Sequence, residues 1–213
     1  MADAALRLIE TPSTPATTED ESTTQVAELV EPGRLVELSA SPRGATARTS
    51  TAVALLRRVQ REGETTAWIQ PAGAPLYPPD LHEGGVDLDA LVVVHVPPAE
   101  GSGGLGKAAE LLLRSGAFGL VVVDLGTIEP RARTAWQGRL LGLARQHESR
   151  ILLLTDKPSH ADSLGPLVGL RIEPRRHRHT QGAFTVEHDV LKNKSGAPVT
   201  VAPDHFTGPP GLH

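Results

Sequence analysis

The feature that most constrains this chain is the repeated alternation of short aliphatic runs with segments of helical periodicity. Leu91–Val96 (LVVVHV), 120–124 (LVVVD) and 151–155 (ILLLT) are continuous aliphatic runs. Such runs are typical of strands that are buried on both faces, as in a parallel sheet covered by helices. The sequence therefore predicts an α/β fold with a mostly parallel, doubly wound sheet.

Further elements are predicted around these runs. The remaining patterns predict strands at 34–39 and 65–70, and helices at 49–61, 107–114 and 133–147. After residue 167 the pattern changes, because 168–172, 183–191 and 199–201 read as consecutive strands with no helix between them. We expect these strands to form an antiparallel C-terminal extension of the parallel sheet.

Composition limits the classes of function. Apolar residues make up 39% of the 213 residues and aromatic residues only 3%, so the core has to be built from aliphatic side chains. Cysteine is absent, which excludes disulfides, thiolate metal sites and a cysteine nucleophile. No apolar run reaches the roughly 18 residues of a membrane span, so no membrane contact is expected. The net charge of −4 provides no global attraction to nucleic acid.

The chain is divided by its composition into three parts. Residues 11–24 (TPSTPATTEDESTT) cannot bury enough apolar surface to offset chain entropy, which predicts a disordered segment over 1–30. One core domain is expected over 31–202. The Pro/Gly-rich residues 203–213 are expected to form a surface tail. The N-terminus lacks the basic and apolar regions of a signal peptide, which favours a cytoplasmic protein.

Two segments resemble phosphate-binding loops. Residues 101–107 (GSGGLGK) match G-x-x-x-x-G-K, with Lys107 as the phosphate ligand. However, Ala108 replaces the magnesium-binding hydroxyl, two prolines precede the loop, and the loop follows the third strand rather than the first. The alternative interpretation is a flexible surface loop.

The second segment is the turn after the first strand, 40–50 (ASPRGATARTS), where Arg48 and Thr49 resemble a remnant of a P-loop. Ala47 stands where such a loop needs glycine, and arginine does not replace lysine at a compact phosphate site. Asp124 ends an aliphatic strand as a magnesium-binding aspartate would, or else it hydrogen-bonds the following turn. We predict a degenerate nucleotide site at Ala47, Arg48, Thr49 and Asp124, with no cofactor, no metal and no ATPase activity.

One dense basic cluster lies at 171–179 (RIEPRRHRH) and contains Arg171, Arg175, Arg176 and Arg178. It could contact DNA phosphates, bind an acidic partner, or be a solvated hairpin. No aromatic residue is interleaved with it, which argues against single-strand binding.

Several motifs, in order, resemble the core of the RecA recombinase over roughly 33–211. Residues 34–38 (RLVEL) look like the strand that leads to its P-loop, and 85–91 (GVDLDAL) look like its turn into a later strand. Residues 114–117 (RSGA), followed by 120–124, are similar to the approach to its Walker B strand. Residues 191–194 (LKNK) with 197–198 (AP) look like one of its hairpins. The resemblance implies a RecA-like, P-loop NTPase-type fold.

The departures from RecA matter for function. Residues 69–73 (IQPAG) lack a carboxylate where RecA carries its catalytic glutamate, and the nucleotide-sensing glutamine is replaced around 155–157. The segments that correspond to the DNA-binding loops, around 126–133 and 157–164, are much shortened, and the large C-terminal domain of RecA is absent. In these losses the chain resembles the ImuA family.

That resemblance implies a non-catalytic accessory factor in SOS-induced mutagenesis and translesion DNA synthesis. Its expected partners are an ImuB-type relative of Y-family polymerases and, in addition, RecA, with weak non-specific DNA contact and recruitment to the nucleoid on DNA damage. Two alternatives remain: a SulA-like inhibitor of cell division, which would bind FtsZ, and a residual RecA-like protein that binds ATP or DNA.

The resemblance also suggests roles for three further residues. Lys192 and Lys194 look like RecA lysines that reach across a protomer interface to the neighbour's ATP, so they are candidates for a RecA interface. The alternative is that they are solvated hairpin residues. Phe206 is a candidate ImuB contact near the C-terminus, or else it folds back to cap the core.

Overall fold

The computed structural model describes residues 26, 28–40, 46–74, 76–129, 133–179, 183–195 and 201–207. The strands in this part of the chain are β1 (Leu35–Ser39), β2 (Thr66–Pro71), β3 (Leu91–Val96), β4 (Leu120–Gly126), β5 (Arg150–Thr155), β6 (Leu170–Arg178), β7 (Ala183–Asn193) and β8 (Asp204–Thr207). The helices are α2 (Arg48–Arg61), α3 (Pro78–Glu83), α4 (Gly101–Ser115) and α5 (Arg133–Gln146), with a short 3-10 helix at Pro98–Glu100.

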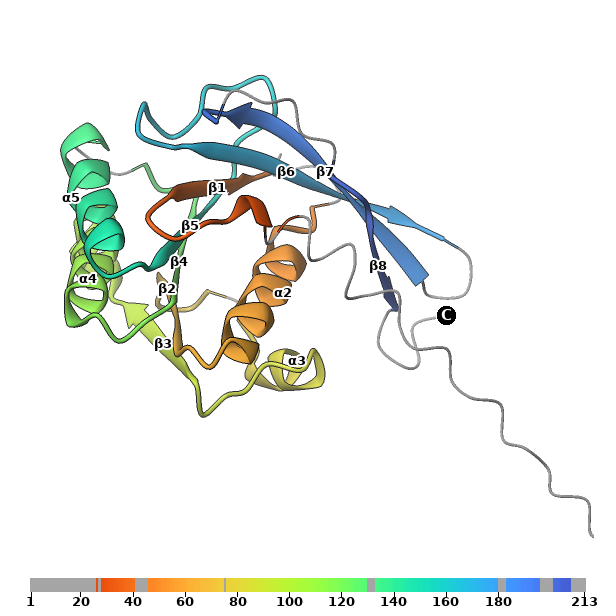
Figure 1. Ribbon diagram of the computed structural model, residues 1–213, viewed down its shortest axis with the longest axis horizontal. Helices are drawn as coiled ribbons and strands as arrows, with labels where there is room; N and C mark the ends of the chain where they lie inside the picture. Colours follow the sequence, from red (N-terminus) through yellow and green to blue (C-terminus); the bar gives the residue numbers. More distant parts are fainter. Residues whose placement is uncertain are drawn as a thin grey trace, which may run out of the picture.

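The strands form one 8-stranded sheet in the order β3-β2-β4-β5-β1-β6-β7-β8 (Figure 1). All pairings from β3 to β6 are parallel, whereas β7 and β8 each join their neighbour antiparallel. A right-handed crossover through a helix is the usual way to connect parallel strands, and a short turn suffices for antiparallel ones. The predicted α/β fold with an antiparallel C-terminal extension is confirmed.

Side chains alternate along each strand and supply two separate cores. On one face, Leu35, Val121 and Ile151 pack with the apolar sides of α4 and α5. On the other face, Val36, Val122 and Leu152 pack with α2. This two-sided burial explains why the sequence shows continuous aliphatic runs rather than alternating ones.

The structure differs most from the predicted boundaries at α4, at β6 and at the last strand. Helix α4 begins at Gly101 rather than Lys107, and β6 runs on to Arg178, through the basic cluster. Of the strand predicted at 199–201, Val201 is not in a strand, and 196–200 lie outside the described residues. The last strand is instead β8, which lies inside the expected surface tail.

The packed part also starts before residue 31, the expected start of the core domain, because Val26 and Val30 are buried in the α2 core. Residues 1–25 and 208–213, on which the expected disorder and most of the expected tail fall, lie outside the described residues. Within the described part, no helix has both the length and the apolar character needed to cross a bilayer.

Candidate functional site

The carboxyl ends of β4, β5 and β1 lie side by side at one edge of the sheet. Helices α2 and α5, which follow β1 and β4, pack on opposite faces. Ligands of open α/β sheets bind at such an edge, where successive helices leave toward opposite faces. The predicted degenerate nucleotide site falls here.

Arg48 is the first residue of α2, and its guanidinium lies 2.5 Å from the carboxylate of Asp156, just after β5. Both side chains are largely buried, with 14% and 24% of their surfaces exposed. The Nε and Nη1 atoms of Arg48 find no hydrogen-bond partner among the described residues, which exclude 41–45. Arg48, the cation of the predicted nucleotide site, is therefore engaged by a carboxylate of the same chain.

Asp124 lies in the same group of charges. Its Oδ1 accepts a hydrogen bond from the backbone N–H of Gly126 at 3.1 Å, the turn contact named above as the alternative to a metal ligand. Burial raises the pKa of Asp124, while Arg48 acts in the opposite direction and Asp156 raises it further. One guanidinium thus faces two carboxyl groups, which disfavours the approach of a polyphosphate.

The other two residues of the predicted site, Ala47 and Thr49, do not place a side chain where it could bind a nucleotide. Ala47 is buried as the N-cap of α2 and provides no side-chain cap, although its backbone N–H donates to the Pro174 carbonyl at 3.2 Å. Thr49 has an exposed side chain. The buried threonine of this helix is instead Thr51, which contacts His188.

The end of β2 carries an amide in place of an acid. Gln70 is buried, and its Nε2 lies 3.3 Å from Nδ1 of His95 on β3. Ala72 follows with its backbone N–H donated to the Val96 carbonyl. No carboxylate is therefore available at this strand end to orient a water molecule or accept its proton.

The G-x-x-x-x-G-K segment is helical. Both interpretations of this segment, a phosphate-binding loop and a flexible surface loop, are therefore wrong. Its residues form the first turns of α4. A Cβ on Gly104 would meet Val96 and Glu100, and one on Gly106 would overlap the indole of Trp136 on α5. Close helix packing explains Gly104 and Gly106, and Lys107 points to solvent.

Arg171 is a structural residue and not a surface contact. It is only 2% exposed and lies 4.0 Å from the buried carboxylate of Glu37. Its Nε donates to Ser39 Oγ at 2.8 Å, and its other nitrogens donate to the carbonyls of Pro158 and Ala161. A buried guanidinium needs such partners, so its assignment to a DNA or acidic-partner contact is corrected.

Glu37 and Arg171 together fix the segment between β5 and β6. The Glu37 carboxylate accepts hydrogen bonds from Thr155 Oγ1 and the backbone N–H of Leu164, both at 2.8 Å. Arg171 holds the segment at two carbonyls. The segment between β5 and β6 is thereby attached to the strand ends.

The two lysines of the KNK motif hold the same segment from the other side. Lys192 Nζ donates to Ser163 Oγ at 2.8 Å and to the Gly165 carbonyl at 3.2 Å, and Lys194 donates to the Pro166 carbonyl. Burial, followed by the nearby charge of Lys194, lowers the pKa of Lys192. The side-chain donors of both lysines are therefore used within the chain.

The remaining arginines of the cluster fall on two faces of the extension. Arg175 pairs with Glu173 at 3.3 Å and with Asp189. Arg176 and Arg178 are exposed, and no ion pair to either is found among the described residues. The sheet therefore divides a cluster that is continuous in the sequence.

Phe206 lies in β8 and stacks on Phe184 of β7, with ring centroids 5.2 Å apart and planes 13° from parallel. It belongs to neither core, so it does not cap the core, and it is held in a paired strand rather than in an irregular tail. No sequence signal could have found this contact, because the two rings belong to different strands.

Sequence reasoning also missed the contact that joins the extension to α2. Nε2 of His188 on β7 lies 3.2 Å from Thr51 Oγ1 and 3.5 Å from the Asp204 carboxylate on β8. Burial lowers the pKa of His188 to about 4, so the ring is neutral at pH 7. Both partners approach the same ring nitrogen, which is not the relay of a catalytic triad.

Comparison of the sequence with protein-family models and with curated proteins finds no match in either set. Within the described part of the chain, no group of three or more His, Asp or Glu side chains is placed to hold a metal ion.

Proposed function

We propose that this chain is a RecA-like, ImuA-type accessory factor of translesion synthesis, which binds proteins and does not hydrolyse ATP. The contact between Arg48 and Asp156 carries the non-catalytic part of the proposal. Phosphoryl transfer needs an available cation for the β- and γ-phosphates, a held magnesium ion and a group that orients the nucleophile. Here the cation is paired within the chain, and the end of β2 offers Gln70 and Ala72.

The positions of the RecA-like motifs support the fold family within this proposal. Residues 85–91 form the turn into β3, and 114–117 end α4, with Gly116 in the left-handed conformation that terminates helices. Residues 192–194 end β7 beside the segment that follows β5. Each motif therefore occupies a turn or strand end, where its residues have a local structural role.

The partner part of the proposal rests on the ImuA resemblance. An ImuB-type polymerase relative is the main expected partner, and RecA is the second. The experiment is a binding assay of the purified full chain with immobilised ImuB-type protein, RecA filaments and FtsZ from the same cell. We expect retention by the ImuB-type protein and none by FtsZ. Binding to FtsZ alone would overturn the proposal in favour of a division inhibitor.

The proposed lack of ATP hydrolysis is tested separately by measuring ATP turnover, with and without single-stranded DNA. We expect no turnover above a protein-free control, since the cation is paired and the carboxylate is missing. DNA-stimulated hydrolysis that disappears in Asp124→Ala would contradict the proposal.

A second candidate, residual binding of an anion without hydrolysis, is favoured by one observation. Two guanidinium nitrogens of Arg48 lack partners among the described residues. Thermal melting with pyrophosphate and with a non-hydrolysable ATP analogue distinguishes the two candidates. A ligand-dependent rise in Tm that Arg48→Gln abolishes would support this second candidate, whereas an unchanged Tm supports the first.

A further inference from the structure

Strand β6 presents its positive charges on two different faces. Residues two apart in a strand share a face, so Arg175 and His177 point to one side while Arg176 and Arg178 point to the other. The antiparallel register places Arg175 opposite Glu187, and Arg178 opposite Phe184. Cross-strand partners share a face, so the two sides carry different chemistry.

The first side is neutralised by the chain itself. Arg175 contacts Glu173 and Asp189, and His177 Nε2 lies 3.1 Å from the Glu187 carboxylate. Every basic side chain of β6 on this side therefore has an acidic neighbour. A ligand with negative charge gains little here, because it has to displace carboxylates that are already in place.

The second side combines cations with aromatic rings. Arg176, Arg178, Phe184 and Phe206 form what we call the Arg/Phe face. The guanidinium carbon of Arg176 lies 5.7 Å from the Phe184 ring centroid, and Phe184 stacks on Phe206. Both rings are half-buried and both arginines are exposed. No described carboxylate pairs with either arginine.

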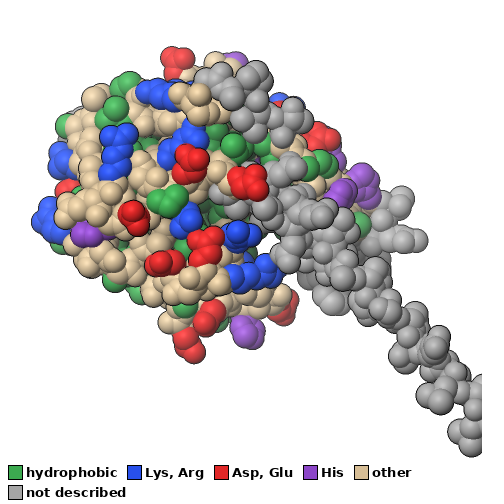
Figure 2. Space-filling model, in the orientation of Figure 1, with side chains coloured by type: hydrophobic (Ala, Val, Ile, Leu, Met, Phe, Trp, Pro, Cys, Tyr) green, Lys and Arg blue, Asp and Glu red, His purple; other side chains and the backbone are tan. Residues whose placement is uncertain are grey.

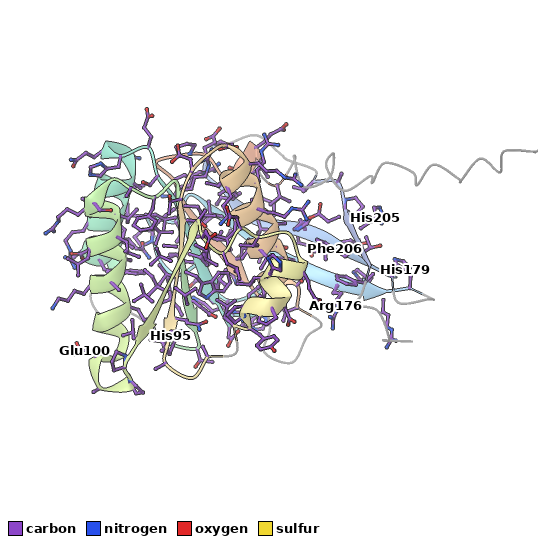
Figure 3. All side chains as sticks on the ribbon, turned by 90° about the horizontal axis from the view of Figure 1, so that it is seen from below. His95, Glu100, Arg176, His179, His205 and Phe206 are labelled. Atoms are coloured by element: carbon purple, nitrogen blue, oxygen red, sulfur yellow. The ribbon has the colours of Figure 1, made fainter. Side chains whose placement is uncertain are left out.

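This face is attached rigidly to the body of the protein but lies away from the carboxyl ends of β4, β5 and β1. Figure 3 shows Arg176 and Phe206 at the outer end of the extension. At the base of the extension, His188 contacts Thr51, and the Ala47 N–H donates to the Pro174 carbonyl. The rings and cations are thus presented on paired strands, which reduces the entropy lost on binding.

We infer that the Arg/Phe face binds single-stranded nucleic acid. The exposed parts of these half-buried rings are available to stack on unpaired bases, and the neighbouring arginines are available to contact the phosphates between them. Duplex bases are hidden in their own stack and offer no such surface. The net charge is −4, and basic and acidic side chains are interspersed on the face that Figure 2 shows, so there is no general electrostatic attraction to nucleic acid. The inference does not depend on the proposed function.

No aromatic residue is interleaved with the basic cluster in the sequence, yet the Arg/Phe face contains two rings. The rings come from β7 and β8, and the sheet brings them beside β6. An acidic peptide is the competing ligand, since it would also be attracted by two unpaired arginines. It differs in having no bases, so it does not need the rings.

The test is fluorescence anisotropy of the full chain with a labelled dT oligonucleotide and a labelled rU oligonucleotide of about 12 nucleotides. The other two probes are a duplex that contains the same dT sequence and a poly-Glu peptide. We expect binding of the single strands and weaker binding of the duplex and the peptide. The ratio of dT to rU affinity shows which nucleic acid is preferred. No binding at about 100 µM protein, the weak end of non-specific binding, would overturn the inference.

The variants separate the rings from the charges. Phe184→Leu/Phe206→Leu keeps apolar bulk but removes the stacking surface, and we expect about tenfold weaker single-strand binding. Arg176→Ala/Arg178→Ala should reduce the salt slope of log K by about 1.4, the contribution of two phosphate contacts to a single strand. Circular dichroism and Tm check that each variant is folded.

The matched control is Arg175→Ala, which removes a cation from the same strand on the opposite face. We expect less than about a twofold change in affinity, because this arginine is already paired. Equal losses of affinity for Arg175→Ala and Arg176→Ala/Arg178→Ala would show that binding does not depend on the face of the strand on which an arginine lies. This result would overturn the inference. Unchanged binding in the phenylalanine variant, or preferential binding of poly-Glu, would overturn it too.

Discussion

The parallel edge of the sheet and its antiparallel extension use arginine in opposite ways. At the parallel edge, Arg48 contacts Asp156, and Arg171 lies beside Glu37 with carbonyl partners around it. On the Arg/Phe face, Arg176 and Arg178 are exposed without an acidic partner in the described part of the chain. The first group holds the chain together, whereas the second remains available to a ligand.

The reason for the difference is the cost of burying charge. Burying a guanidinium without hydrogen-bond or charge partners costs too much free energy. The partners of the arginines at the parallel edge are therefore required by burial, and they do not indicate whether a ligand binds there. An exposed guanidinium needs no partner. Missing partners therefore indicate a binding surface only where other features, here two stacked rings, point to the same ligand.

The largest effect is expected from Glu37→Gln at the parallel edge. The change leaves the Arg171 charge buried without its carboxylate, and we expect a loss of about 3–5 kcal/mol in the free energy of unfolding. Urea denaturation measures it. Glu187→Gln, which alters an exposed pair with His177, is the control and should change stability by less than about 0.5 kcal/mol. Similar losses in both variants would mean that the two regions do not differ as described.

The second effect concerns the junction between the two regions and depends on pH. The pKa of His188 is about 4 in the folded protein, below the ordinary histidine value of 6.5, so the unfolded chain binds the proton more readily between these values. The contribution to stability is present in full above pH 6.5 and is lost as the pH falls toward 4. It amounts to at most about 3 kcal/mol.

Urea denaturation of wild type and His188→Gln across this pH range measures the loss. We expect the variant to lose less stability than the wild type as the pH falls, because glutamine does not titrate. Parallel curves for the two proteins would contradict the assignment of this pH dependence to His188.

A third, intermediate effect concerns the glycines of α4. Gly106→Ala places a methyl group against Trp136 and should cost about 1–3 kcal/mol. Gly103→Ala meets no atom within 4 Å and should stabilise the helix by up to about 1 kcal/mol. Thermal denaturation of the two variants gives opposite signs if these residues are helical. Equal, small shifts in Tm would instead indicate a flexible loop.

The smallest effect is expected on the neutralised side of the extension. Arg175→Ala removes a contact to Asp189 between side chains that are 50% and 43% exposed, and such pairs contribute about 0–1 kcal/mol. Urea denaturation at low and high salt measures the contribution. A loss above about 2 kcal/mol would show that this pair stabilises the extension far more than its exposure suggests.

Much of the parallel sheet could be predicted from sequence, because burial on both faces leaves a local signature. Leu91–Val96 was predicted with the same bounds that β3 has, and the other parallel strands differ from prediction by a few residues at their ends. The antiparallel extension was predicted less well. Strand β6 continues through charged residues, and β8 contains Asp204 and His205, so neither carries an aliphatic run.

The candidate sites show the same limit. That Arg48 and Asp124 lie near each other could be predicted from the sequence, because they follow or end strands of the same parallel sheet. The basic cluster could not be interpreted correctly, since burial of Arg171 depends on Glu37 and on carbonyls far away in the chain. The glycine-rich segment was misread for a similar reason: Trp136, which requires Gly106, belongs to another helix.

The sequence by itself determined the α/β class and the parallel strands, because these depend on residue type and local periodicity. Only the tertiary structure decided which arginines are buried, which are neutralised and which remain exposed beside aromatic rings. The physical reason is that charge pairing and ring stacking depend on strand register, and register joins residues that no local pattern connects.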